Sequence, residues 1–155
     1  RDWLKSDVGL VQSAFMAGIG AAGLLCALSS SARWERRTLW MPSLLTVPIL
    51  LILPRLDGPL LHFATLSTGF LLGLALPVLI STGQRMLPES PRVASSVTMG
   101  VSWGIGGGIV SGIIHLCERW QAYDAAFAGF AVAATLSSVL CVALPSPEAV
   151  HPAQD

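Results

Sequence analysis

Charged residues are scarce in this sequence. Only 12% of its 155 residues are Asp, Glu, Lys or Arg, whereas an ordinary soluble domain has about 25%. Nine basic and nine acidic residues cancel to a formal net charge of zero, so the sequence predicts neither a basic surface for nucleic acid nor an acidic tail. Hydrophobic residues make up 53% of the chain. This composition excludes most soluble classes and predicts a lipid bilayer as the main partner, with no nucleic acid.

Cysteine is scarce too, and the cysteines form no pair of the kind found in metal or redox sites. The three cysteines, Cys26, Cys117 and Cys141, form no C-x-x-C pair, and each lies in or at the end of an apolar run. The usual role of such a cysteine is that of a small buried hydrophobic residue. We therefore predict no metal site, no cofactor and no catalytic residues. The first residues, "RDWLKSD", show neither a methionine nor a signal peptide, which favours a piece of a longer protein.

Long uncharged runs separate the few charged stretches. A helix needs about 20 apolar residues to cross a bilayer, and the runs predict five transmembrane helices, at 8–28, 39–53, 59–83, 93–117 and 124–144. The second run is short and contains Pro42 and Pro48, so it is predicted to extend into its flanks or to be kinked. The predicted fold class is an all-α polytopic bundle over residues 8–144. Residues 1–7 are predicted as an extracytoplasmic loop and 145–155 as a cytoplasmic tail.

The basic residues predict the orientation. The loop after the first span, "SSSARWERRT", holds the densest cluster, with Arg33, Arg36 and Arg37. By the positive-inside rule this loop is cytoplasmic, as is the loop after the third span. Four tryptophans lie near span ends, as expected for the membrane interface, but Trp103 lies in the middle of the fourth span.

The stretch "GVSWGIGGGIVSG", residues 100–112, allows three interpretations. A serine-hydrolase elbow needs a strand, a strained turn and a helix, yet Ser102 lies within an uncharged run that a bilayer forces to be helical. A phosphate-binding loop needs a following lysine or a strict G-x-G-x-x-G, and here the third position of that pattern is Ile109. We therefore favour the third interpretation, a helix face made of small residues, and predict that the chain is not an enzyme.

Small residues recur at every fourth position in this span, at Gly100, Gly104, Gly108 and Gly112. Such a ladder lets another helix approach closely in a membrane, so we predict that these glycines face a neighbouring helix. Similar ladders occur in three other spans: Ala14, Gly18 and Ala22; Thr65, Gly69 and Gly73; Ala125, Gly129, Ala133 and Ser137. A static bundle would satisfy the pattern. The extra glycines of the fourth span also suit a helix that bends or slides.

The segment 76–113 resembles the tenth and eleventh helices of major facilitator superfamily transporters, and is most similar to the fosmidomycin-resistance-like drug exporters. The matching positions are Gln84, Leu87, Pro88, Ala94, Ser95, Gly100, Gly104, Gly106 and Gly107. The loop after the first span resembles the superfamily's cytoplasmic signature only in its last two positions, Arg36 and Arg37. On this alignment the chain is a partial major-facilitator fold, helices eight to twelve, and the seventh helix and the N-terminal half are missing partners.

The resemblance implies a function. It implies part of a secondary active transporter of the bacterial inner (plasma) membrane that exports a small drug-like molecule or metabolite by proton antiport, through alternating access. Helices eight, ten and eleven line the cavity in this family, so the pathway residues would be Gln12, Thr68, Ser102 and Trp103. Trp103 could stack on a substrate or fill space beside the glycines. The alternative is a non-transporting helical membrane protein that acts as a scaffold or assembly partner.

Overall fold

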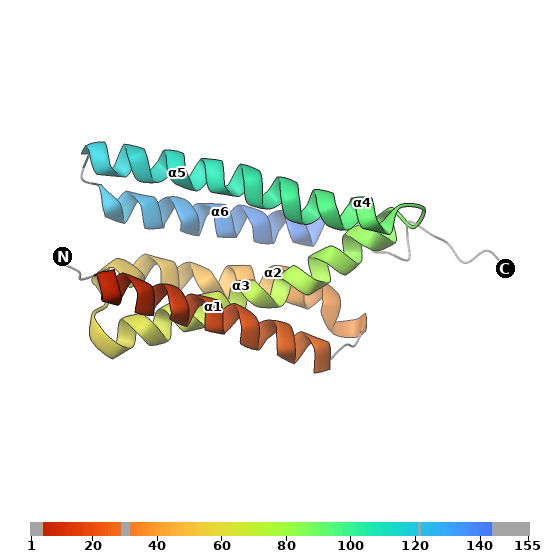
Figure 1. The fold of residues 1–155 in the computed structure, drawn as a ribbon, viewed down its shortest axis with the longest axis horizontal. Helices are drawn as coiled ribbons and strands as arrows, with labels where there is room; N and C mark the ends of the chain where they lie inside the picture. The colour runs from red at the N-terminus through yellow and green to blue at the C-terminus, as the bar shows by residue number, and fades with distance from the viewer. Residues whose placement is uncertain (1–4, 29–31, 121, 144–155) are drawn as a thin grey trace.

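The computed structural model describes residues 5–28, 32–120 and 122–143, and for residues 5 and 32–36 it describes the backbone alone (Figure 1). All elements of this part of the chain are helical. In order they are α1 (Lys5–Leu28), α2 (Ala32–Ile52), η1 (Leu53–Arg55), α3 (Gly58–Met86), α4 (Pro91–Ser96), η2 (Val97–Val101), α5 (Ser102–Trp120) and α6 (Tyr123–Ala143). They form five helical stretches long and apolar enough to cross a membrane. The prediction of an all-α chain with five such helices is confirmed.

The helices begin earlier than the uncharged runs do. α1 begins at Lys5, so residues 5–7, predicted as loop, form its first turn. α2 begins at Ala32, so most of the predicted basic loop is helix. The reason is that Ala, Arg and Glu are good helix formers. Charged residues mark the point where a helix leaves the lipid, but the helix itself can continue beyond that point. The predicted tail, 145–155, lies outside the described residues.

Two prolines lie inside α2, and the helix continues through both, giving it 21 residues. Proline has no N–H to donate and its ring crowds the preceding turn, so a helix tolerates it only with compensation. Between the two prolines, the fully buried hydroxyl of Thr46 donates to the carbonyl of Pro42 at 2.8 Å, so this polar group is satisfied inside the helix. The predicted extension of the second span into its flanks is therefore observed.

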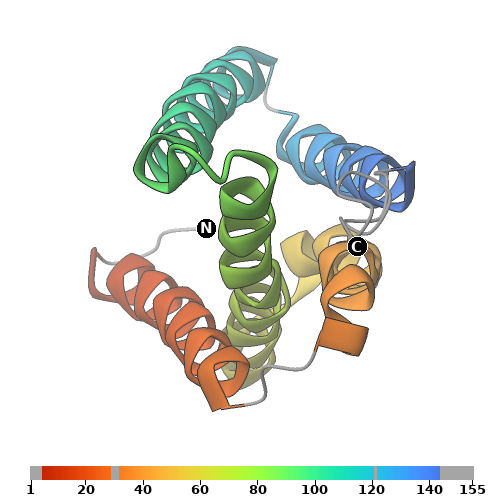
Figure 2. The same ribbon diagram turned by 90° about the vertical axis from the view of Figure 1, so that its right-hand side faces the viewer.

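α3 is the central helix of the bundle and contacts both α1 and α2 (Figure 2). Its buried residues follow one helical stripe: Leu61, Ala64, Thr65, Thr68, Gly69 and Gly73. The sharp entry into α3 depends on Gly58, whose φ of +57° lies in the left-handed region that glycine adopts without a steric penalty. α3 is thereby placed between the two other helices of the first half of the chain.

The contact between α1 and α3 is made by their predicted ladders. A Cβ added to Gly69 would collide with the carbonyl oxygen of Phe15, and one added to Gly73 would lie 2.8 Å from the Cα of Ile19. A Cβ on Gly18 would lie 2.7 Å from the backbone nitrogen of Phe70. Both helices therefore need glycine at these positions, and the prediction of close packing by these two ladders is confirmed.

The second half of the chain contacts the first through α4 and η2, which lie against α3, and through α6, which packs on α2. The buried residues of α6 are Ala126, Ala131 and Ser138, and the Ser138 hydroxyl donates to the backbone carbonyl of Trp40 at 2.9 Å. The predicted ladder of this helix is not the contact face, since Ala125, Gly129, Ala133 and Ser137 are exposed. Small residues and a serine occur on both faces of α6, and the face with Ala126, Ala131 and Ser138 is the buried one.

Candidate functional site

The fourth membrane span, Pro91–Trp120, is the segment in which the sequence concentrates its candidate residues. The sequence predicts one uninterrupted helix here. In the structure, a five-residue π-helical segment, η2, separates α4 from α5. A π segment carries its backbone hydrogen bonds from i to i+5, and such segments are frequent at functional sites. The span is therefore two helices joined by a local change of helical winding.

The first part of the span, α4, is held against the end of α3. The side-chain amide of Gln84 donates to the hydroxyl of Ser95 at 2.7 Å, and that hydroxyl donates to the carbonyl of Pro91 at 3.0 Å. Further along, a Cβ on Gly83 would lie 3.0 Å from the hydroxyl oxygen of Thr98. Ala94 is buried with only 2% of its surface exposed. The hydrogen bond thus fixes α4 to α3, and the close contact at Thr98 fixes the start of η2 to the same helix.

The second part, α5, is uncovered. No residue from 95 to 116 is buried, and Cys117 is the first buried residue after Ala94. α5 contacts α6 and the adjoining η2 within the described chain, and Figure 2 shows α5 and α6 diverging from the point where the chain passes between them.

The glycine ladder of α5 therefore has no partner helix in the described chain. A Cβ added to Gly100, Gly104, Gly108 or Gly112 would meet no atom within 4 Å. The expected contact with a neighbouring helix is thus not made by the described helices, of which only α6 and the adjoining η2 contact α5. The glycines form an open face, against which a helix could pack closely but no described helix does.

The four candidate pathway residues are not brought together. Gln12 is exposed on α1, Ser102 and Trp103 are exposed on α5, and these two helices make no contact with each other. Thr68 is 5% exposed and its hydroxyl donates to the Ala64 carbonyl at 2.9 Å, so its polar group is used inside α3. Trp103 is 60% exposed, so it does not fill space in the interior of the described chain.

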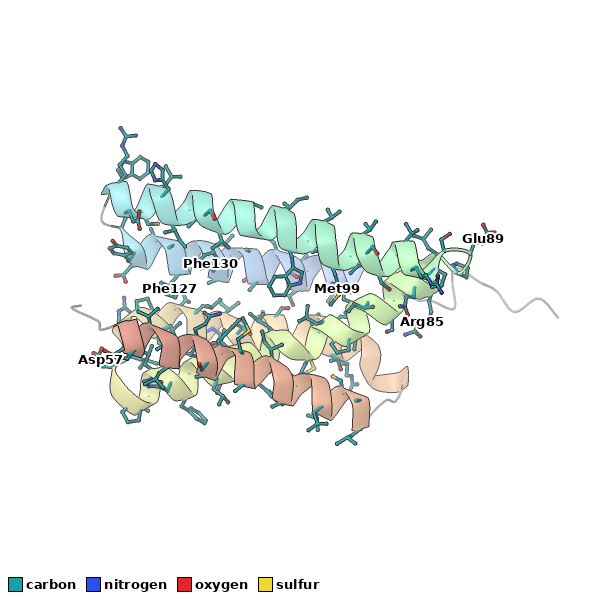
Figure 3. All side chains as sticks on the ribbon, viewed as in Figure 1. Asp57, Arg85, Glu89, Met99, Phe127 and Phe130 are labelled. Carbon is teal, nitrogen blue, oxygen red and sulfur yellow. The ribbon has the colours of Figure 1, made fainter. Side chains whose placement is uncertain are left out.

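The charged candidates lie at the ends of the bundle. Arg37 is exposed near the start of α2, and the side chain of Arg36 lies outside the described residues. Figure 3 shows Arg85 and Glu89 at one end of the helices and Asp57 at the other. Within 37–120 and 122–143 the carboxylates are Asp57, Glu89, Glu118 and Asp124, each within three residues of a helix end. Among the described residues no group of three or more His, Cys, Asp or Glu could hold a metal ion.

Two features that shape this region are not predicted by the sequence. The π segment consists of "VTMGV", whose composition does not differ from that of an α-helical membrane span. The hydrogen bond between Ser138 and Trp40 joins residues 98 positions apart, and no local sequence pattern predicts it. Gln84 and Ser95 do carry a signal, since both are polar residues at the inner flanks of a short loop.

The described part of the chain is thus an all-helical bundle with a tightly packed side, α1 to α3, and an uncovered helix, α5. Five of its helical stretches are long and apolar enough to cross a membrane, which is compatible with an integral membrane protein. Comparison of the chain with protein-family models, with curated proteins and with solved structures finds no match in any of the three.

Proposed function

We propose that the chain is part of a secondary active transporter of the major facilitator superfamily, which exports a small drug-like molecule or metabolite by proton antiport with alternating access. The single observation that carries this proposal is the grouping of the helices. α1 pairs with α3, α2 pairs with α6, and the glycine face of α5 is left open. If the five spans are helices eight to twelve, the first, third and fourth are those that line the cavity in this family.

The open face of α5 supports the proposal because a transporter half needs surfaces that are not yet covered. Alternating access requires one bundle to rock against another around a central site. The exposed small residues on α5 would allow another helix to pack closely against α5 in one state and to move away in the other. Trp103 and Ser102 begin this helix, so an indole N–H, an aromatic ring and a hydroxyl lie next to the open face.

The proton-coupling group of this proposal would belong to the missing half. Proton antiport needs a carboxylate or similar group within the membrane that titrates as access alternates. The Asp and Glu residues of 37–120 and 122–143 all lie near helix ends, so they suit the membrane surfaces better than the middle of the membrane. The chain would therefore supply part of the substrate pathway, and its partner bundle would supply the coupling.

A second candidate function, a scaffold or assembly partner, is favoured by the same open face. A helix ladder without a partner in its own chain can bind a helix of another protein in the membrane. In that case the bound helix would stay in place, and no substrate would cross.

The reading frame upstream of Arg1 separates the two candidates. The transporter proposal expects six or seven further spans there, with an intact Gly-x-x-x-Asp-Arg signature in the half that precedes this chain. A start codon directly before Arg1 would contradict it. The complete gene product, expressed in an efflux-deficient bacterium, should then lower the accumulation of a panel of dyes and antibiotics that includes fosmidomycin.

The substitution Trp103→Ala tests the pathway in the same assay. We expect export to fall about two- to tenfold, because the loss of one aromatic contact with the substrate is worth about 0.5–1.5 kcal/mol. The matched control is Trp120→Ala, since Trp120 is also exposed but lies at the end of α5. Equal export by the wild type and by Trp103→Ala would remove Trp103 from the pathway. Export that is absent in the wild type as well would favour the scaffold.

A further inference from the structure

We propose that the part of α5 between its two ends moves relative to α3, hinged at the π segment η2, while α4 stays fixed to α3. The hinge lies at Val97–Val101, in the part of the fourth span where the winding changes. This inference concerns the motion of one helix, and it holds whether or not the chain transports a substrate.

The first step is that the fourth span is fixed through α4 and the first residues of η2. Ser95 accepts a hydrogen bond from Gln84 of α3, and Thr98 approaches Gly83 of the same helix. Buried Ala94 lies close to both contacts in the sequence. A force on the span beyond this point therefore moves only the residues after Thr98, since α4 and the end of α3 move as one unit.

The second step is that the span is unsupported after η2. No residue of α5 before Cys117 is buried, and the ladder glycines have open space where a side chain would be. Trp103 and Ile109 of this helix are exposed by 60% and 58%. Packing against the described helices therefore gives α5 no single preferred position along most of its length.

The third step is that the far end of α5 is held again. The backbone N–H of Ala122 donates to the carbonyl of Cys117 at 3.1 Å, and α6 begins at Tyr123 and packs along α2. With both ends held, the middle of α5 is the part that can swing. Gly104, Gly106, Gly107 and Gly108 lie in the first half of α5, soon after η2, where their low helix propensity permits bending.

The fourth step is that η2 differs from an ordinary turn in a way that suits a hinge. A π segment includes an extra residue in one turn, and a mid-helix change of winding is one of the few identifiable causes of a bend. Met99, at the centre of η2 (Figure 3), is exposed, as is Gly100 next to it. The part of η2 after Thr98 can therefore rewind without breaking a packed core.

The test measures distances between spin labels in the full chain, reconstituted in lipid nanodiscs, with the three native cysteines replaced by alanine. Phe63 of α3, exposed by 70%, carries one label in every sample. The second label is placed at Val93, before η2, or at Ile109, after it; both are exposed. We expect the Phe63–Ile109 distance distribution to be about twice as broad as the Phe63–Val93 distribution. The motion of the labels themselves broadens both distributions equally, so the difference in width reports the motion of the helix.

Two variants locate the hinge. Deletion of Met99 removes the extra residue and should narrow the Phe63–Ile109 distribution to about the width of Phe63–Val93. Gly100→Ala, which adds a methyl group into open space within η2, should narrow it partly. The matched control is Gly20→Ala on α1, another glycine with nothing within 4 Å, and it should leave the width unchanged.

Two results would overturn the proposal. One is a Phe63–Ile109 distribution as narrow as that of Phe63–Val93 in the unmodified chain. The other is a broad distribution that stays broad in the Met99 deletion, which would place the motion elsewhere than η2. If the deletion variant does not fold, Gly100→Ala decides in its place, and an unchanged width then overturns the hinge.

Discussion

Gly69 is the residue on which the packing of α1 and α3 depends most directly. A Cβ there would collide with the carbonyl oxygen of Phe15 and lie 2.9 Å from its carbonyl carbon. Since both atoms belong to the backbone of α1, no side-chain rotation can make room. We expect Gly69→Ala to lower the free energy of unfolding by about 1–3 kcal/mol, the usual penalty for overpacking. Unfolding in mixed micelles at increasing dodecyl sulfate measures this change.

Gly104→Ala provides the matched comparison for Gly69→Ala. Both are glycines of ladder positions in membrane helices, but the added Cβ at Gly104 meets nothing within 4 Å. Alanine is the better helix former by roughly 0.5–1 kcal/mol, so the variant should be as stable as the wild type or more stable. Equal destabilisation by the two substitutions would mean that α5 is covered in the membrane as closely as α1 is.

Residue patterns alone predict the helices better than their contacts. The lengths of uncharged runs predict five membrane helices because a bilayer imposes a length and satisfies no backbone group. The ladder at Gly69 predicts a close contact, but the same spacing at Gly108 does not lead to one in the described chain. A ladder of small residues indicates that another helix can pack closely against it. Which helix does so depends on the whole fold. The Ser138–Trp40 bond joins residues 98 positions apart, and η2 has the composition of an ordinary membrane span, so no local pattern predicts either of them.

At the scale of elements, α6 is fixed to α2 by a hydrogen bond between a side chain and a backbone group. Ser138 is 4% exposed, and its hydroxyl donates to the Trp40 carbonyl. We expect Ser138→Ala to reduce stability by about 0.6 kcal/mol, the average for hydrogen bonds between membrane helices. The same titration in dodecyl sulfate measures it. Ser137→Ala is the control, since Ser137 is exposed at the adjacent position and its substitution should leave stability unchanged.

The tie between α3 and α4 can be measured by a double-mutant cycle. Gln84→Ala, Ser95→Ala and the double variant should give a coupling free energy of about 0.5–1.5 kcal/mol, the range for one hydrogen bond. The cycle is repeated with Ser96→Ala in place of Ser95→Ala, because Ser96 is the exposed neighbour and should show no coupling to Gln84. Zero coupling in the first cycle would mean that the 2.7 Å bond does not hold α4 in place.

At the scale of the whole molecule, the two ends of the bundle differ in their basic residues. One end has the start of α2, with Arg37, and the end of α3, with Arg85; the opposite end has Arg55 and Arg119. The basic cluster that precedes Arg37 in the sequence, with Arg33 and Arg36, adds to the first end. The positive-inside rule therefore predicts that the first end is cytoplasmic.

Cysteine labelling in intact cells tests this orientation and the spanning of the membrane at once. In a background without native cysteines, Arg37→Cys and Arg85→Cys should react with a membrane-impermeant maleimide only after permeabilisation, because they lie at the predicted cytoplasmic end. Arg55→Cys and Arg119→Cys should react in intact cells. The reverse pattern would invert the topology without changing the fold. Reaction of all four in intact cells would mean that α2, α3 and α5 do not cross the bilayer, since each of them has one of these arginines at or near an end.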